Sequence, residues 1–207
     1  MSSPISNPRS PSTFSPVSVV ESPITAQKGQ LRGTPRTVRD AVAELFNNIQ
    51  EWNRLHISGM SIIQEITSKK LESINKKESG PNMFPEGLQV DCNKLDSICA
   101  QLESVVKKME KILNNFKAIE QLEEMNKTGR RSIFTTWNAE KYVSAVKAIF
   151  EAYDTEVKVK CHIKENIAHV DGKDKMMLHC ALWAHQPYVD NVLDFYLESM
   201  LKETGHR

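Results

Sequence analysis

The residues that could carry out catalysis or bind a metal are few and widely spaced in this sequence. Glu165 and His169 are four residues apart, which suits two ligands on one helix face, but no second such pair accompanies them. His179 and Cys180 are adjacent, and successive helical residues point about 100° apart, so they do not form a base and nucleophile pair. The four cysteines contain no C-x-x-C spacing. We therefore expect structural thiols, no metal site and no catalytic residue.

Motifs and composition point the same way. The sequence has no glycine-rich phosphate loop, no H-E-x-x-H and no G-x-S-x-G, so we expect neither an enzyme nor a bound cofactor. A net charge of +1 gives no overall attraction to nucleic acid or anionic lipid, and we expect no direct binding to either. Mean hydropathy is −0.44, and no apolar run approaches the roughly 18 residues of a membrane span. We expect a soluble, intracellular protein.

Proline follows serine or threonine five times near the N-terminus, in a pattern that proline-directed kinases recognise. The candidate phosphorylation sites are Ser10, Ser15, Ser22 and Thr34. A segment rich in serine and proline also produces such pairs by composition alone, and both interpretations stay open. Thr34 is the best candidate because it lies beside a predicted helix start, where phosphate is favoured. This composition cannot offset the entropy of ordering, so we predict a disordered, basic tail over residues 1–34.

Two long helices must follow the tail. Apolar residues at helical spacing predict a first helix over about 37–75, with Thr37 as its cap. The pattern is interrupted at His56 and Gly59, which indicates a local stutter or a close backbone approach. A loop rich in glycine and proline over 76–87 leads to the second helix, whose heptad seam is apolar at eight positions of eight. The seam consists of Leu95, Ile98, Leu102, Val105, Met109, Ile112, Phe116 and Ile119.

A second apolar column accompanies this seam and widens the face enough to receive a third helix. We therefore predict an all-α fold, an elongated antiparallel coiled coil or helical bundle of about five helices. Its domains are a two-helix hairpin at 35–125 and a helical region at 126–207 that packs on the hairpin or extends it. The seam closes within one chain, in a homodimer or on a partner. The second column consists of Cys92, Cys99, Val106 and Leu113.

The C-terminal third contains three shorter predicted helices. Phe134 and Trp137 in the preceding linker either plug the end of the hairpin or form a docking hook. The third helix runs from about 138 to 168, because the strand-like alternation over 157–163 has no strand to pair with.

The fourth helix runs from Lys175 to about Gln186 with Asp174 as its cap, and Pro187 ends it. The fifth helix stops at Gly205. The packing face of the fifth helix consists of Val192, Leu193, Tyr196, Leu197, Met200 and Leu201.

Bulky, half-polar residues gather where the fourth helix ends, and they are our candidate partner-docking residues together with Trp137. In the alternative interpretation Pro187 only turns the chain and Trp183 packs inward. The candidates at this corner are Trp183, His185, Gln186, Pro187 and Tyr188.

This corner also resembles the C-terminus of the cyclin-dependent kinase 2-interacting protein family. The likeness spans most of the ordered region in order and spacing, and it is most specific near the C-terminus. The resembling stretches are 183–189, 197–201 and 203–207, with further matches at 34–36, 108–111 and 136–137.

The resemblance implies a noncatalytic adaptor located in the nucleus, with the cytoplasm as a second location. Its implied partners are a cyclin-dependent kinase and a second kinase at replication origins, and ATR-interacting protein in checkpoint signalling. As an alternative, it implies a structural subunit of a chromatin-linked AAA-type ATPase assembly that maintains replisomes and acts in ribosome maturation. A generic coiled-coil tether is the third interpretation.

Overall fold

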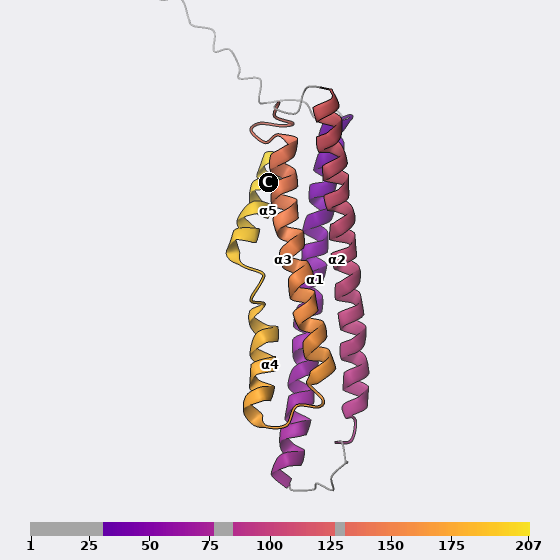
Figure 1. Cartoon of the computed structure of the whole chain (residues 1–207), viewed down its shortest axis with the longest axis vertical. Helices are drawn as coiled ribbons and strands as arrows, with labels where there is room; N and C mark the ends of the chain where they lie inside the picture. The colour runs from indigo at the N-terminus through magenta and orange to yellow at the C-terminus, as the bar shows by residue number, and fades with distance from the viewer. Residues whose placement is uncertain (1–30, 77–84, 127–130) are drawn as a thin grey trace, which may run out of the picture. The chain divides into compact units, whose positions relative to one another are not determined.

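The computed structural model describes residues 31–76, 85–126 and 131–207, and Arg32–Arg207 form one compact unit. Over the described residues the unit is built from helices and contains no strand, which confirms the predicted all-α fold (Figure 1). None of these helices combines the length and the apolar character that crossing a membrane requires. The helices are α1 (Thr34–Lys76), α2 (Leu88–Met125), α3 (Ala139–Asn166), α4 (Lys173–His185) and α5 (Asn191–Glu203).

The helices of this unit form an antiparallel bundle with four positions. Helices α1, α2 and α3 alternate in direction, and α4 and α5 follow one another in the fourth position (Figure 1). Helix α2 packs against α1 and α3, while α4 and α5 each pack against both α1 and α3. The fourth helix of the bundle is therefore split in two by the segment 186–190.

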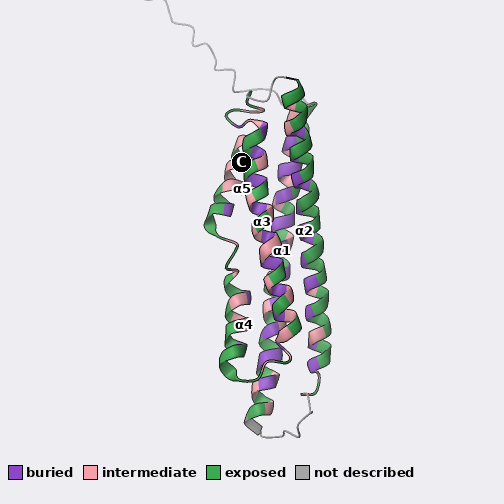
Figure 2. Ribbon diagram, in the orientation of Figure 1, coloured by how far each residue is buried: buried purple, intermediate pink, exposed green. Residues whose placement is uncertain are grey.

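Buried residues lie on the inner faces of the helices (Figure 2). Of the eight seam positions on α2, seven are buried and Ile98 is half-buried. In the second column Cys99, Val106 and Leu113 are buried and Cys92 is half-buried. Each large apolar side chain buried in this way contributes about 1.5–3 kcal/mol. Because α2 buries both columns against α1 and α3, the seam closes within this chain.

The start of α1 differs from the prediction. The helix begins at Thr34, three residues earlier than expected, after Gly33 with φ 65°. Pro35 fits there because the first turn of a helix leaves its N–H groups unpaired. Thr37 Oγ1 donates to the Gly33 carbonyl at 3.3 Å and does not act as the predicted cap. The predicted tail is thus shorter at its C-terminal end, and its residues 1–30 lie outside the described part of the chain.

Helix α3 is continuous through the segment that alternates like a strand. Asn138 caps it, because its side chain accepts a hydrogen bond from the Lys141 backbone N–H at 3.0 Å. Val157, Lys160 and Ile163 are all buried, and their three-residue spacing places them on one helix face. The alternation over 157–163 resembles a strand because Lys160, which looks like a surface residue, is in fact buried in the core.

The two short helices begin in different ways. Helix α4 starts at Lys173 with Gly172 at the cap position, so the prediction of Asp174 as cap was wrong; Asp174 lies in the first turn. Helix α5 is capped by Asp190, whose Oδ1 accepts from Val192 N at 3.0 Å and Leu193 N at 3.3 Å. This cap fixes the residue at which α5 begins.

Candidate docking site at the break between α4 and α5

Trp183, a predicted docking residue, is fully buried. Its indole lies on α1 at Gly59, and its Nε1 donates a 3.0 Å hydrogen bond to the carbonyl oxygen of His56. The interruption of the α1 pattern at these two residues is therefore a close approach that only glycine permits. Because Trp183 has no accessible surface, its assignment as a partner contact was wrong.

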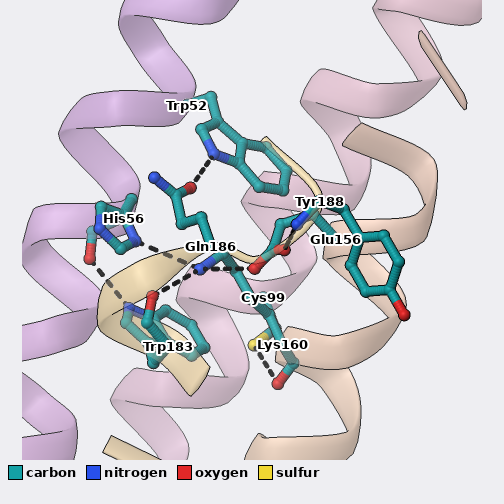
Figure 3. A network of polar contacts seen from close by, with 8 residues as sticks. All are labelled: Trp52, His56, Cys99, Glu156, Lys160, Trp183, Gln186 and Tyr188. Atoms are coloured by element: carbon teal, nitrogen blue, oxygen red, sulfur yellow. Dashed lines mark hydrogen bonds and ion pairs between the residues drawn. The ribbon is translucent and has the colours of Figure 1, made fainter. Parts of the chain in front are cut away.

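Lys160 of α3 lies fully buried beside Trp183 (Figure 3). Its Nζ lies 3.3 Å from Glu156 Oε1 and 4.3 Å from the centroid of the Trp183 ring. The same ammonium group donates to the Trp183 carbonyl at 3.3 Å and lies 3.2 Å from His56 Nδ1. One buried cation thus connects α1, α3 and α4.

Burial determines the charges in this cluster. It lowers the pKa of Lys160 to about 8, and the ammonium group therefore stays charged at neutral pH. Burial raises the pKa of Glu156, and the charge of Lys160 opposes that shift. Burial and the Lys160 charge together lower the pKa of His56 to about 4. His56 is therefore neutral at pH 7, and its Nδ1 accepts the hydrogen bond from Lys160.

The break itself is fixed by hydrogen bonds to buried side chains. Gln186 has φ 44°, a left-handed conformation that is strained for any residue except glycine. Its Oε1 accepts a 2.7 Å hydrogen bond from Trp52 Nε1, which holds this conformation. Two residues later, the Tyr188 backbone N–H donates to Glu156 Oε2 at 3.3 Å (Figure 3). Gln186, predicted as a docking residue, is half-buried and serves to anchor the corner.

The cluster is arranged for holding the fold together. Cys99 Sγ lies 3.9 Å from the Lys160 carbonyl, and burial raises the pKa of this thiol to about 12, so it is unreactive at neutral pH. Over the described residues no group of three or more His, Cys, Asp or Glu side chains is placed to hold a metal ion. Glu165 and His169 both lie exposed near the end of α3.

Exposed apolar side chains follow this buried cluster along the chain, beginning at Tyr188, whose backbone N–H donates to Glu156. Tyr188 is 50% exposed and Phe195 is 68% exposed, and Val192 between them is also exposed. Val192 was predicted to face the core, and that prediction was wrong: its side chain is exposed, whereas that of Leu193 beside it is buried. We call this the docking surface, and its residues are His185, Pro187, Tyr188, Val192 and Phe195.

Trp137, the other predicted docking residue, is buried at the far end of α3. Its ring centroid lies 5.1 Å from that of Tyr142, and its backbone N–H donates to Glu203 Oε1 at 2.9 Å. Phe134 beside it is half-buried against the core. The linker aromatics plug the end of the bundle, so the docking hook was wrong.

Only one of the predicted phosphorylation sites, Thr34, lies among the described residues. Ser10, Ser15 and Ser22 lie outside the described residues. Thr34 is the first residue of α1, with its hydroxyl turned toward α2.

The sequence patterns did not predict every residue of this site. Lys160 and Glu156 were missed because charged residues are expected at the surface, although His56 beside Gly59 marked the place on α1 where they converge. Phe195 was missed because it lies off the predicted packing face of its helix.

The fold and the site define a helical-bundle protein with a split fourth helix and an aromatic surface at the split. No family model matches the chain. It is similar to Cyclin-dependent kinase 2-interacting protein of Xenopus laevis, with 31% identity over 199 residues that cover 89% of this chain and 95% of the relative. The mouse relative of that name is 29% identical over 201 residues (88% and 95%), and the human one 28% over 202 residues (89% and 95%). The chain belongs to the cyclin-dependent kinase 2-interacting protein family.

Proposed function

We propose that this chain is a noncatalytic cell-cycle adaptor that binds a cyclin-dependent kinase through the docking surface. The names of its relatives state that they interact with such a kinase. The observation that carries the proposal is the exposure of Tyr188 and Phe195 at and just after the break between α4 and α5. Tyr188 leaves its side chain half exposed while its backbone N–H is held by buried Glu156.

This arrangement has the properties of a protein contact site. Aromatic side chains dominate the binding energy of many interfaces, and a contact already held in place loses little entropy on binding. Two exposed aspartates, Asp190 and Asp194, lie among these apolar residues in the sequence, so this part of the surface carries acidic charge. The complementary partner surface is apolar with basic residues at its margin.

The family resemblance supports a finer proposal. In it the adaptor acts in the nucleus, joins the cyclin-dependent kinase to a second kinase at replication origins, and binds ATR-interacting protein in checkpoint signalling and genome maintenance. Imaging of the tagged chain in cells tests the location, and a purely cytoplasmic signal would contradict it. Turnover in a hydrolase or transferase screen would contradict a noncatalytic role.

The alternatives keep the same fold. A structural subunit of an AAA-type ATPase assembly would elute in one large complex with the ATPases, whereas an adaptor would also occur with kinases in separate fractions. A simple tether would bind neither kind of partner. Light scattering on the purified chain tests self-association, and a mass near 23.5 kDa would argue against a homodimer.

The direct experiment measures the affinity of the purified chain for a purified cyclin-dependent kinase 2–cyclin complex. Phe195→Asp and Tyr188→Asp are each expected to weaken binding about tenfold or more, as expected for an interface aromatic. The matched control is Val90→Asp, because Val90 is equally exposed but belongs to α2, which does not pack against α4 or α5. Unchanged affinity of both docking variants, with unchanged thermal melting, would overturn the proposal.

A further inference from the structure

A threonine–proline pair lies at a contact between two helices. Thr34 is the first residue of α1, and it belongs to the one Ser/Thr-Pro pair that falls within the described residues. It is half-buried, and its Oγ1 donates a 3.1 Å hydrogen bond to Glu123 Oε1 in the last turns of α2. The hydroxyl group that a kinase would modify therefore joins the start of α1 to the last turns of α2.

A cavity of about 420 Å³ opens beside this hydroxyl group. Thr34, Glu123 and Arg131 all line it, so an acidic and a basic residue border the same space. Arg131 is exposed and forms no ion pair with any described residue. A phosphate group on Thr34 would thus have a cation and the positive end of a helix within the cavity that it enters.

The local backbone favours access by a kinase. A residue that precedes proline is disfavoured in helical angles, so Thr34 holds its place in α1 weakly. Gly33 before it has φ 65° and forms a sharp turn. Helix ends open at little free-energy cost, which lets the Thr34-Pro35 pair extend into a kinase active site.

We propose that Thr34 is a phosphorylation site for a proline-directed kinase, and that the phosphate exchanges the Glu123 partner of Thr34 for Arg131. In this step Thr34 Oγ1 attacks the γ-phosphorus of Mg²⁺-bound ATP. The O–H bond breaks and its proton passes to a carboxylate of the kinase, while the bond from the γ-phosphorus to the bridging oxygen breaks and ADP leaves.

Phosphorylation turns the attractive contact between Thr34 and Glu123 of α2 into a repulsive one. The phosphoester has no hydroxyl proton to donate to Glu123, and it places a charge of about −1.5 to −2 opposite that carboxylate. Repulsion from Glu123 and attraction to Arg131 act in the same direction. Phosphorylation therefore separates the start of α1 from the end of α2, and leaves the packed core of the bundle in place.

The first experiment uses the full chain with the four other acceptors changed to alanine, at Ser3, Ser10, Ser15 and Ser22. It is incubated with Mg²⁺-ATP and, separately, a purified cyclin-dependent kinase and a purified mitogen-activated kinase, and the product is mapped by mass spectrometry. We expect one phosphate, on Thr34, and none when Thr34→Ala is added. If both kinases modify serines of the unsubstituted chain and neither modifies Thr34, the site is excluded.

The second experiment measures amide hydrogen exchange of the phosphorylated chain over residues 119–125. We expect exchange to be about threefold faster than in the unmodified chain, because a charged contact at a helix end is lost. Glu123→Gln should reduce this difference, since it removes the repulsion. Equal exchange rates before and after phosphorylation would overturn the partner exchange. The inference is independent of the docking surface, and Phe195→Asp should be phosphorylated as well as the unsubstituted chain.

Discussion

The indole of Trp183 fills the space that any side chain at position 59 would need. A Cβ built on Gly59 would lie 2.2 Å from Trp183 Cζ2, well inside the contact distance of two carbon atoms. Because Trp183 also donates to the carbonyl of His56, α4 is fixed to α1 at one turn. The rest of the site depends on this contact, since the Trp183 carbonyl and ring are both partners of Lys160.

Gly59→Ala should therefore destabilise the protein, although alanine is the better helix former by about 1 kcal/mol. Overpacking against a buried ring outweighs that gain, and we expect the free energy of unfolding to fall by about 1–3 kcal/mol. Urea denaturation measures the change. Ser61→Ala on the exposed face of the same helix is the control and should show no loss. An equal or greater stability of Gly59→Ala would refute the close contact.

Lys160→Met should destabilise the protein by about 3–5 kcal/mol, because it leaves Glu156 buried without its cation. Adding Glu156→Gln should recover part of that loss, and a double-mutant cycle of unfolding free energies measures the coupling. Lys158→Met provides the control on the same helix. Its ammonium group forms an exposed pair with Asp154, so it should change stability by less than about 0.5 kcal/mol. Additive effects at Lys160 and Glu156 would contradict the pair.

Acid should weaken the fold through His56. Its pKa is about 4 in the folded chain against about 6.5 for an ordinary histidine, so between these values the unfolded chain binds a proton that the folded chain does not. The free energy of unfolding should consequently fall as the pH drops from 6.5 to 4. His56→Asn should make this dependence shallower, which urea denaturation at a series of pH values measures. Identical slopes for both chains would rule out the buried neutral histidine.

Leu102→Asp should unfold the bundle. Leu102 is fully buried between α2 and its neighbours, and an unpaired charge at such a position costs several kcal/mol. Circular dichroism during heating should show a strongly lowered or absent transition. Gln101→Asp, at the exposed position immediately before it, should melt close to the unsubstituted chain. A Leu102→Asp chain with an unchanged melting temperature would contradict the seam.

The seam was predictable because helix geometry alone repeats a packing face every seven residues. Seven of its eight members are buried, since α1 and α3 approach α2 along its length. Ile98 is half-buried, because the edge of that face is decided by how closely its neighbours approach, which periodicity does not contain.

The corner was located from the sequence, but the roles of its residues were not. Proline and the bulky residues around it marked a break, as found. Which of them turn inward depends on Gly59 and Lys160, which are distant in the chain. Val192 is exposed while Leu193 is buried, because the inward face of so short a helix depends on where it packs against α1 and α3. The local sequence pattern predicts neither which corner residues are buried nor which face of α5 packs inward.

The split divides the fourth position of the bundle between two short helices that make separate contacts with the core. Helices α4 and α5, both fully within the described chain, pack against α1 and α3 but not against each other. Trp183 secures one half, while Leu197, Met200 and Leu201 secure the other. Detaching α5 would therefore uncover one end of the core and leave α4 in place. A protein that supplies a short helix of its own would have to displace only half a column of this bundle.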